Sequence, residues 1–416
     1  MHRYRELLRN PSFSRLWMGS TISMFGDALT WISMVWLVYS LAGTTETISL
    51  LVVCYTAPVV VGGFAMGVAL DRLDRRHMLI VVNVALGCAI ATIPLLHALH
   101  ALRLREIYVV AAVYGLLKMA NWAGVPTLIP ILVKPEHLTT ANAMESASWG
   151  IADVAGPAAA GAVIAIVGAA NVLVIDAISY IVFVLVLVWL RLPATNRAST
   201  RDRSEDRAGL RPAFQFLRRT PPVLATTLMF MAFNVGEGML LVLLPEIVRH
   251  TLHAGSATYG LLASTFSLAA LIGSIAVGAV RWRYTLGRSI AVAQAVAGVA
   301  FLGLAVAHGV IGVALTLAMA GFLASPLSIW AQTIRMRLVP DDLRGRIFGV
   351  LRTMMQATPP IGGVAAGAAL AGPGLVFAVV SMGAAMAVPG LIGMMTPGLA
   401  DPELQADAAP ASSAGS

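Results

Sequence analysis

Long apolar stretches separated by short polar breaks run through most of the chain. A transmembrane helix needs roughly 20 consecutive apolar residues, so each stretch of that length is a predicted span. In order, the predicted spans are roughly 15–41, 47–70, 78–100, 106–133, 140–168, 171–190, 222–248, 257–280, 287–308, 311–336, 345–371 and 374–396. The pattern predicts an all-α integral membrane protein with about twelve transmembrane helices.

The two sets of six spans resemble each other in sequence. FGDALTWISMVWLV, from Phe25, aligns with VGEGMLLVLLPEIV, from Val235, and this alignment places Asp27 opposite Glu237. Further matches follow in the same order: Gly67 with Gly278, Pro135 with Pro340, and GPAAAG from Gly156 with the IGGVAAG that ends at Gly367. Their common order indicates a duplication. Both halves start from the same side, so we expect two parallel, pseudo-symmetric six-helix bundles.

Polar segments set the expected domain boundaries. The first bundle is predicted over 1–192 and the second over 220–398. Between them, 193–219 is an Arg-rich linker. The tail, 399–416, is rich in Ala, Ser and Pro and acidic, so it is expected to be disordered.

The charges agree with a membrane protein. Charged residues make up 12% of the chain, whereas a soluble domain carries about a quarter. The net charge of +8 comes from short basic clusters between apolar stretches, so a nucleic-acid partner is not expected. Nearly all Arg and Lys fall on alternate connections, and the other side has only Arg103, Arg105 and Arg249. Both termini and the linker are therefore predicted to be cytoplasmic.

Two parallel six-helix repeats joined by a basic loop resemble the major facilitator superfamily, and local motifs agree. GVALDRLDRRHML is similar to the superfamily's loop motif after the second helix, with Gly67, Asp71, Arg72, Arg75 and Arg76 at matching positions. Asp74 departs from the motif, because many members have Gly there. DRLDRR, GDALTWISMVWLVY and LRGRIFGVLRT resemble the macrolide-efflux and enterobactin-exporter branch. The resemblance covers essentially the whole chain and implies a secondary transporter.

Two motifs are candidates for gating. Asp71 and the arginines of the loop motif can form charge-assisted hydrogen bonds that exist in one access state only. Alternatively, these arginines only set the topology. GPAAAG is similar to the superfamily's exporter-associated motif, and the resemblance implies export; Pro157 bends the helix while Gly156 and Gly161 allow close approach. Simple packing of small residues is the alternative.

Ionisable residues inside the predicted spans are candidates for proton coupling. A charge at the bilayer centre costs at least ~2.5–3.5 kcal/mol, so such residues face a cavity or a partner. Those well inside are Asp27, Lys118, Asp153, Glu237 and Arg352, whereas Asp176 lies nearer the outer face, and Glu46, Glu145 and Glu246 are expected to reach water. Asp27 and Glu237, in equivalent places, are the main coupling candidates, and Asp153 is a third. Alternatively, Lys118 pairs structurally with Asp27 or Asp153.

Aromatic residues accompany these charges at helical spacing. Trp31 follows Asp27 by four, Tyr114 and Trp122 flank Lys118, Trp149 precedes Asp153 by four, Phe233 precedes Glu237 by four, and Gln356 follows Arg352 by four. Positions four apart share a helix face. Charges among aromatics suit a cavity for an amphipathic or cationic organic substrate. Packing between helices is the alternative for each aromatic.

No enzyme constellation appears in the sequence, so catalytic and metal-binding residues are not expected. There is no phosphate-cradling P-loop, and we expect no cofactor and a proton gradient as the driving force. The sequence favours a proton-coupled exporter of a drug, macrolide-like compound or siderophore, acting as a monomer among the lipids of a bacterial inner membrane. The alternative is a lysophospholipid transporter or a uniporter of the same fold. A membrane sensor or enzyme would need an extramembrane domain or a catalytic cluster.

Overall fold

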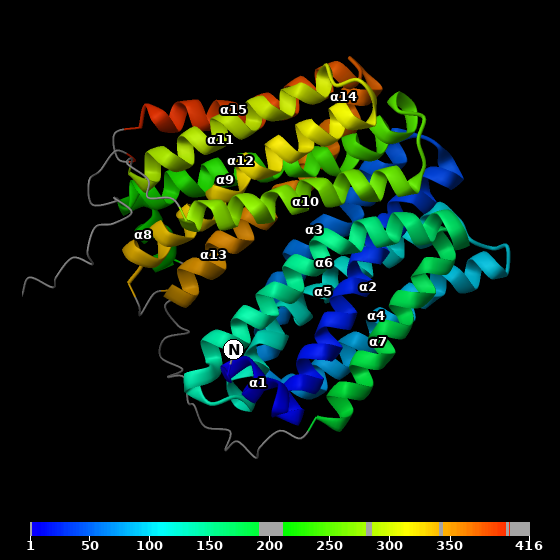
Figure 1. The fold of residues 1–416 in the computed structure, drawn as a ribbon, viewed down its shortest axis with the longest axis vertical. Coiled ribbons are helices and arrows are strands. Elements are labelled where there is room, and N and C mark those ends of the chain that lie inside the picture. The colour runs from blue at the N-terminus through cyan, green and yellow to red at the C-terminus, as the bar shows by residue number, and fades with distance from the viewer. Residues whose placement is uncertain (1, 191–210, 280–284, 341–343, 397–398, 400–416) are drawn as a thin grey trace, which may run out of the picture. The chain divides into compact units, whose positions relative to one another are not determined.

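The computed structural model describes residues 2–190, 211–279, 285–340, 344–396 and 399. All regular elements of these residues are helices (Figure 1). By their packing, Met1–Arg197 and Leu244–Ser264 form a first unit, and Ala198–Leu243 and Thr265–Ser416 form a second. The predicted tail from residue 400 on and most of the predicted linker lie outside the described residues.

The first repeat forms six long helices where the apolar stretches predict them. They are α2 (Pro11–Ala42), α3 (Thr45–Arg72), α4 (Arg75–Ala98), α5 (Leu104–Leu132), α6 (Leu138–Val167) and α7 (Ala169–Trp189), after a short α1 (His2–Arg9). Local sequence explains the ends of α2. The Asn10 side chain accepts hydrogen bonds from the backbone N–H of Ser12 and Phe13, and Gly43 ends the helix with φ of 65°.

The second repeat follows the same plan with one break. Its helices are α9 (Pro221–Glu246), α10 (Ser256–Ala279), α11 (Leu286–Leu302), α12 (Gly309–Leu338), α13 (Arg344–Gln356), α14 (Pro359–Ala371) and α15 (Leu375–Met394), with α8 (Arg211–Arg219) before them. The span expected over 345–371 is formed by two helices, α13 and α14, and not by one. Pro359 and Pro360 supply no backbone N–H and disfavour helical geometry just before them.

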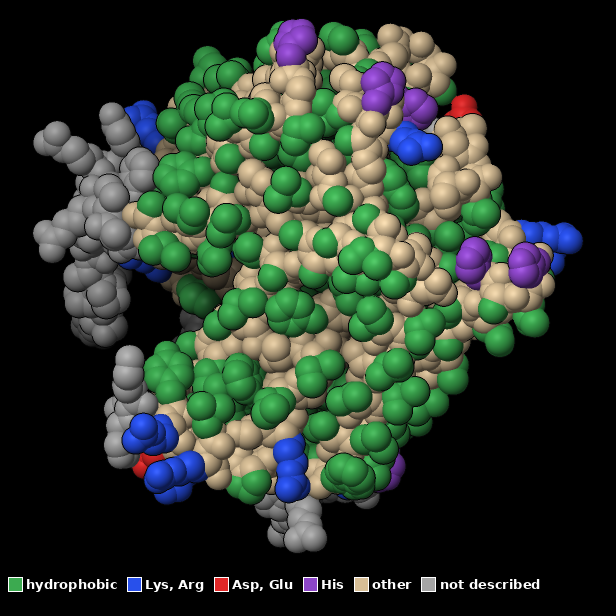
Figure 2. All heavy atoms as spheres, turned by 45° about the vertical axis from the view of Figure 1, so that its right-hand side comes forward, with side chains coloured by type: hydrophobic (Ala, Val, Ile, Leu, Met, Phe, Trp, Pro, Cys, Tyr) green, Lys and Arg blue, Asp and Glu red, His purple; other side chains and the backbone are tan. Residues whose placement is uncertain are grey.

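The described helices have the lengths and surfaces of membrane spans. Eleven of them are long and apolar enough to cross a membrane. Large apolar side chains such as Val81, Leu95 and Ile178 are exposed, and hydrophobic side chains cover much of the face in Figure 2. A soluble monomer rarely exposes this much contiguous apolar surface. The chain is a multi-pass membrane protein.

Glycine contacts show that both repeats use the same helix pairs. Gly26 of α2 lies against Ser179 of α7, and Gly236 of α9 lies against Met386 of α15. Two residues further on, Ala28 meets α6 and Gly238 meets the first residue of α14. The aligned segments around Asp27 and Glu237 thus occupy corresponding places in their own units.

The outer pairs of each repeat correspond as well. α3 packs on α5 through Gly62 and Leu116, and α10 packs on α12 through Gly273 and Phe322. α4 runs beside α7, as α11 runs beside α15 (Figure 1). These shared pairings confirm the predicted pair of pseudo-symmetric six-helix bundles, with α13 and α14 together taking the eleventh place.

Candidate functional site

A buried carboxylate on α2 is the centre of the candidate site. Asp27 is 9% exposed, and its Oδ1 accepts hydrogen bonds from the hydroxyls of Tyr114 (2.5 Å) and Tyr180 (2.6 Å). Its Oδ2 lies 3.3 Å from Nζ of Lys118, which also donates to the Tyr114 hydroxyl at 3.1 Å. Three helices, α2, α5 and α7, therefore converge on one carboxylate.

A second carboxylate completes this group. Asp176 of α7 is fully buried, and it accepts hydrogen bonds from the hydroxyls of Thr30 and Ser179, the latter at 2.9 Å. It lies against Gly26, the residue before Asp27, where the absence of a Cβ makes room for it. We call Asp27, Tyr114, Lys118, Asp176 and Tyr180 the Asp27 cluster.

The Asp27 cluster combines two buried carboxylates with one buried ammonium group. Two carboxylates share one ammonium group, so the cluster has one more negative than positive charge when all three are ionised. Water is largely excluded, and an uncompensated buried charge is costly. The cluster becomes neutral when one proton resides on either carboxylate. The Tyr114 and Tyr180 hydroxyls donate to Asp27, and the Thr30 and Ser179 hydroxyls donate to Asp176, so each carboxylate has donors of its own.

Sequence reasoning missed Asp176 as a member of this group. It placed Asp176 nearer the outer face, because only its distance from the helix end was considered. Two signals in the sequence could have found it. Ser179 follows it by three, which permits a local hydrogen bond on one helix face, and Gly26 beside Asp27 permits a polar group to approach.

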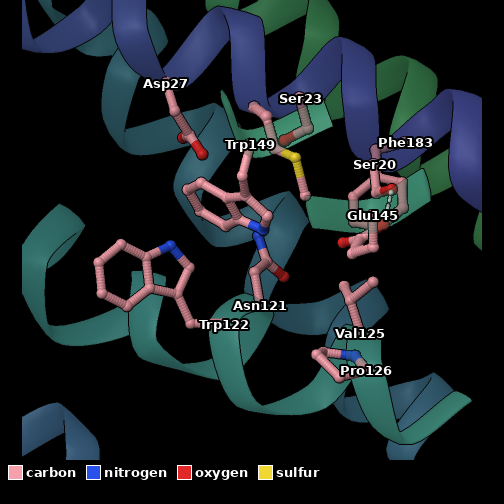
Figure 3. Close-up of a pocket in the computed structure, with 11 residues that line it drawn as sticks. Ser20, Ser23, Asp27, Asn121, Trp122, Val125, Pro126, Glu145, Trp149 and Phe183 are labelled. Carbon is pink, nitrogen blue, oxygen red and sulfur yellow. Dashed lines mark hydrogen bonds between the residues drawn. The ribbon is translucent and has the colours of Figure 1, made fainter. Parts of the chain in front are cut away.

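A small cavity adjoins the Asp27 cluster (Figure 3). Asp27 of α2, Trp122 of α5, and Trp149 and Glu145 of α6 are among its lining residues. The two indole rings meet edge to face with centroids 5.4 Å apart. The volume is about 30 Å³, which holds one or two water molecules. Asp27 therefore shares a cavity within the first unit with polar and aromatic side chains.

The environment of Glu145 differs from the expected one. Its place near a helix end led us to expect contact with water, but it is buried, and it accepts a hydrogen bond from the Ser20 hydroxyl at 3.5 Å. Its α6 helix packs against α2, which covers the carboxylate. Two carboxylates therefore line the cavity, Asp27 of α2 and Glu145 of α6 (Figure 3).

The other predicted site residues are more scattered. The Trp31 ring lies tilted against the Tyr55 ring of α3, with centroids 5.0 Å apart, and Tyr55 in turn stacks on Tyr114. Asp153 is exposed on α6. The remaining predicted residues belong to the second unit: Phe233, buried on α9; Glu237, exposed on α9; Arg352, exposed on α13; and Gln356, half-buried at its end. The structure thus brings Asp27, Tyr114, Lys118, Trp122 and Trp149 together.

Part of the loop motif caps helices. The Arg76 guanidinium donates to the carbonyls of Leu187, at 2.7 Å, and Val188, at the end of α7. Asp74 is the N-cap of α4 and accepts from the backbone N–H of His77 at 2.9 Å. The side chains of Gly67, Asp71 and Arg72 lie outside the described residues, and Arg75 is exposed. The gating role of these residues stays a prediction.

The Gly-Pro motif of α6 packs closely against two neighbours within the first unit. Gly156 lies against Ala28 of α2, and Gly161 lies against the carbonyl of Ser256, the first residue of α10. The Ala158 N–H, one residue after Pro157, donates to the Ser264 hydroxyl at 2.9 Å. Small side chains thus bring the backbones of three helices together, as expected for packing in membranes.

Known proteins resemble the whole chain. The major facilitator family described as transmembrane secretion effector matches residues 6–413. The multidrug efflux pump Tap of Mycolicibacterium fortuitum is 24% identical over 390 residues, covering 91% of this chain and 94% of that protein. The enterobactin exporter EntS of Citrobacter koseri is 24% identical over 373 residues, covering 88% and 86%.

A solved structure supports the fold. The nucleoside transporter NupG superposes with a TM-score of 0.74 at 10% identity, covering 92% of this chain and 99% of that one. At this identity the likeness shows the shared fold alone.

Proposed function

Because the chain belongs to the transmembrane secretion effector family of the major facilitator superfamily, we propose that it is a proton-coupled exporter of amphipathic small molecules. Its family consists of transporters and not of enzymes. Two similar proteins are named for efflux of drugs and of enterobactin, and these names support export as the direction. Alternating access by two six-helix bundles is the general mechanism of this fold.

Proton coupling is assigned to the Asp27 cluster. The single observation that carries this proposal is the buried Asp27–Lys118 pair, which shares its surroundings with a second carboxylate. Protonation of Asp27 would free Lys118 to compensate Asp176 instead. A proton would thus change the pairing within the bundle, which is what a coupling site must do. Glu237, the equivalent residue of the second repeat, remains a second candidate for this role.

The substrate class follows from the cavity beside Asp27. Two indole rings and the Glu145 carboxylate line it. Aromatic faces and carboxylates together bind cationic or amphipathic organic molecules. The cavity is too small to enclose such a molecule, but a catecholate siderophore would stack on the exposed faces of these indoles and a macrolide-like compound would place apolar surface against them. We propose that such a substrate contacts this wall of the first unit.

The membrane and the orientation are also part of the proposal. The basic residues of alternate connections support a cytoplasmic location of both termini in a bacterial inner membrane. All groups of the Asp27 cluster come from one chain, so a monomer would be sufficient for coupling.

Proton release from the purified protein tests the proposed function. Lipophilic cations, macrolides and a catecholate siderophore would be added separately to protein in weakly buffered detergent, and the pH recorded. Asp27→Asn keeps the shape of the side chain but cannot exchange a proton. Glu46→Gln, at an exposed position of α3, is the matched control that removes a carboxylate elsewhere.

Release by one compound class, lost in Asp27→Asn and kept in Glu46→Gln, supports antiport and identifies the substrate class. Release that persists in Asp27→Asn places coupling elsewhere, and Glu237→Gln is then the next variant. Binding without proton release in the wild type contradicts proton coupling and favours a uniporter or a carrier of lysophospholipids.

A further inference from the structure

A second buried charge, on α12 in the second unit, has no role in the proposed coupling. Arg335 is 4% exposed, although the sequence places it among the basic residues that set topology. Its Nη2 lies 3.5 Å from the sulfur of Met355, and its guanidinium lies 5.7 Å from the ring centre of Phe230. Its Nε is buried without a hydrogen-bond partner. Among the described residues, no Asp or Glu forms an ion pair with it.

A buried guanidinium in this setting is costly. Sulfur is a weak acceptor and a cation–π contact replaces only part of the lost hydration. Removing an ion from water costs several kcal/mol unless a partner of opposite charge is present. The end of α12 favours a cation, but Arg337, which is exposed two residues later, serves that purpose without burial. Among the residues that the structure describes, Arg335 therefore has no partner of opposite charge.

A pocket supplies the space for such a partner. It has a volume of about 340 Å³ and is lined by Arg335 and Gln332 of α12 and by Arg352, Phe348 and Leu351 of α13. Two guanidinium groups and one amide thus border the same space, beside apolar side chains. Arginine binds carboxylate and phosphate oxygens with paired N–H groups. The apolar residues suit a hydrocarbon portion attached to the anion.

We propose that this pocket binds the oxyanion group, a phosphate or a carboxylate, of an amphipathic molecule through Arg335 and Arg352. The anion compensates the buried guanidinium and accepts its unused Nε–H. Every residue of the pocket belongs to the second unit, and the site does not depend on coupling at Asp27. Two sources offer this chemistry: the headgroup of an anionic phospholipid and a small soluble anion.

Thermal unfolding of the delipidated full-length protein in detergent distinguishes these sources. The probes are dioctanoyl phosphatidylglycerol, its zwitterionic phosphatidylcholine counterpart and inorganic phosphate. We expect phosphatidylglycerol to raise Tm and phosphatidylcholine not to. In Arg335→Met the apparent Kd for the anion should rise at least about tenfold, because hydrogen bonds to a charged group are lost. Arg337→Met removes the same charge two residues away and should keep the response.

The Tm of Arg335→Met, measured without any added ligand, gives a second readout. A site built for an anion carries an uncompensated charge when empty, so Arg335→Met should unfold at the same or a higher temperature than the wild type. A guanidinium that only packs on Phe230 predicts a lower Tm. If Arg335→Met does not fold, Arg352→Gln, at an exposed position, replaces it and should also weaken binding.

The outcomes separate cleanly. Stabilisation by phosphatidylglycerol alone assigns the site to a lipid headgroup, stabilisation by phosphate alone assigns it to a soluble anion, and stabilisation by both shows that the oxyanion suffices. Equal stabilisation by phosphatidylcholine, no response to either anion, or a response that survives both arginine substitutions overturns the proposal.

Discussion

The two repeats build the same helix crossings from different chemistry. In the first repeat, Gly26 of α2 faces Asp176 and Ser179 of α7; in the second, Gly236 of α9 faces Met386 of α15. The side chain opposite the glycine is thus a buried carboxylate, Asp176, in the first repeat and a thioether, Met386, in the second. The second crossing forms without any charge, so the fold does not require one at this place.

The crossing of α3 with α5, which corresponds to that of α10 with α12, shows the same difference. Gly115 packs on the carbonyl of Tyr55 in the first repeat, and Gly321 packs on the carbonyl of Phe266 in the second. Tyr114 and Lys118, one before and three after Gly115, correspond to Ala320 and Ala324. The Asp27 cluster therefore exists in one repeat only, and its polar groups are best explained by function.

Removing the single cation of the cluster should have the largest effect on stability. Lys118→Met leaves two buried carboxylates without a counter-charge, which we expect to lower the free energy of unfolding by about 3–5 kcal/mol. The measurement is thermal unfolding in detergent. Ala324→Met, at the corresponding place of the second repeat, is the control and should change stability little.

The double variant Asp27→Asn/Lys118→Met sharpens this test. It removes one charge of each sign, so it should recover part of the lost stability despite carrying two substitutions. A double variant less stable than Lys118→Met would show that Asp27 and Lys118 do not compensate each other.

The tyrosines of the cluster should have the next largest effect. Tyr180→Phe removes one hydroxyl that donates to Asp27, at a cost of about 1.5–3 kcal/mol for a hydrogen bond to a charged group. We also expect transport to slow, because Asp27 loses one of its hydrogen-bond donors. The measurements are thermal unfolding and transport in vesicles at several pH values.

Tyr55→Phe is the control for Tyr180→Phe. It converts Tyr55 to the residue that the second repeat has naturally, and it keeps the ring that stacks on Tyr114 at 5.8 Å. A change below about 0.5 kcal/mol is expected. Equal effects of the two substitutions would mean that ring packing, and not the hydrogen bond to Asp27, stabilises this region.

Much of the fold follows from the sequence, since membrane spans depend on the length of apolar stretches and on little else. The alignment of Asp27 with Glu237 also predicts which helices correspond. The break between α13 and α14 within the span predicted over 345–371 was not expected, because hydropathy does not register a loss of backbone N–H groups, which Pro359 introduces.

The site was only partly predictable. Helical spacing relates residues on one helix, and it found Tyr114 with Lys118, but it does not say which helices meet. The contact of Asp176 with the residue before Asp27 depends on how α2 and α7 cross. Arg335 was missed for a related reason: basic residues at helix ends usually reach water, but Phe230 of α9 and Met355 of α13 lie against this one.

Alanine substitutions of Gly26 and Gly236, the corresponding glycines of the two repeats, should differ in their effect on stability. An added Cβ at Gly26 would meet the Asp176 carboxylate and the Ser179 hydroxyl, whereas one at Gly236 would meet the flexible end of Met386. We expect Gly26→Ala to destabilise by about 1–3 kcal/mol and Gly236→Ala by clearly less, because a methionine can move aside. Thermal unfolding of both variants measures the difference. A larger loss of stability in Gly236→Ala than in Gly26→Ala would contradict this expectation. It would mean that the contact of Gly26 with Asp176 and Ser179 tolerates an added methyl group better than the contact of Gly236 with Met386.

The smallest effect is expected where the loop motif meets α7. Arg76 donates to two carbonyls at the end of α7, the helix that carries Asp176 and Tyr180. Arg76→Ala should cost about 0.3–1 kcal/mol, since it removes a cation from a helix C-terminus. Arg75→Ala is the control, because Arg75 is exposed and its contact with the Thr127 carbonyl is long, at 3.5 Å. If Arg76→Ala slows transport far more than Arg75→Ala at equal stability, the motif acts on the Asp27 cluster through α7. Equal transport by both variants would limit Arg76 to capping this helix.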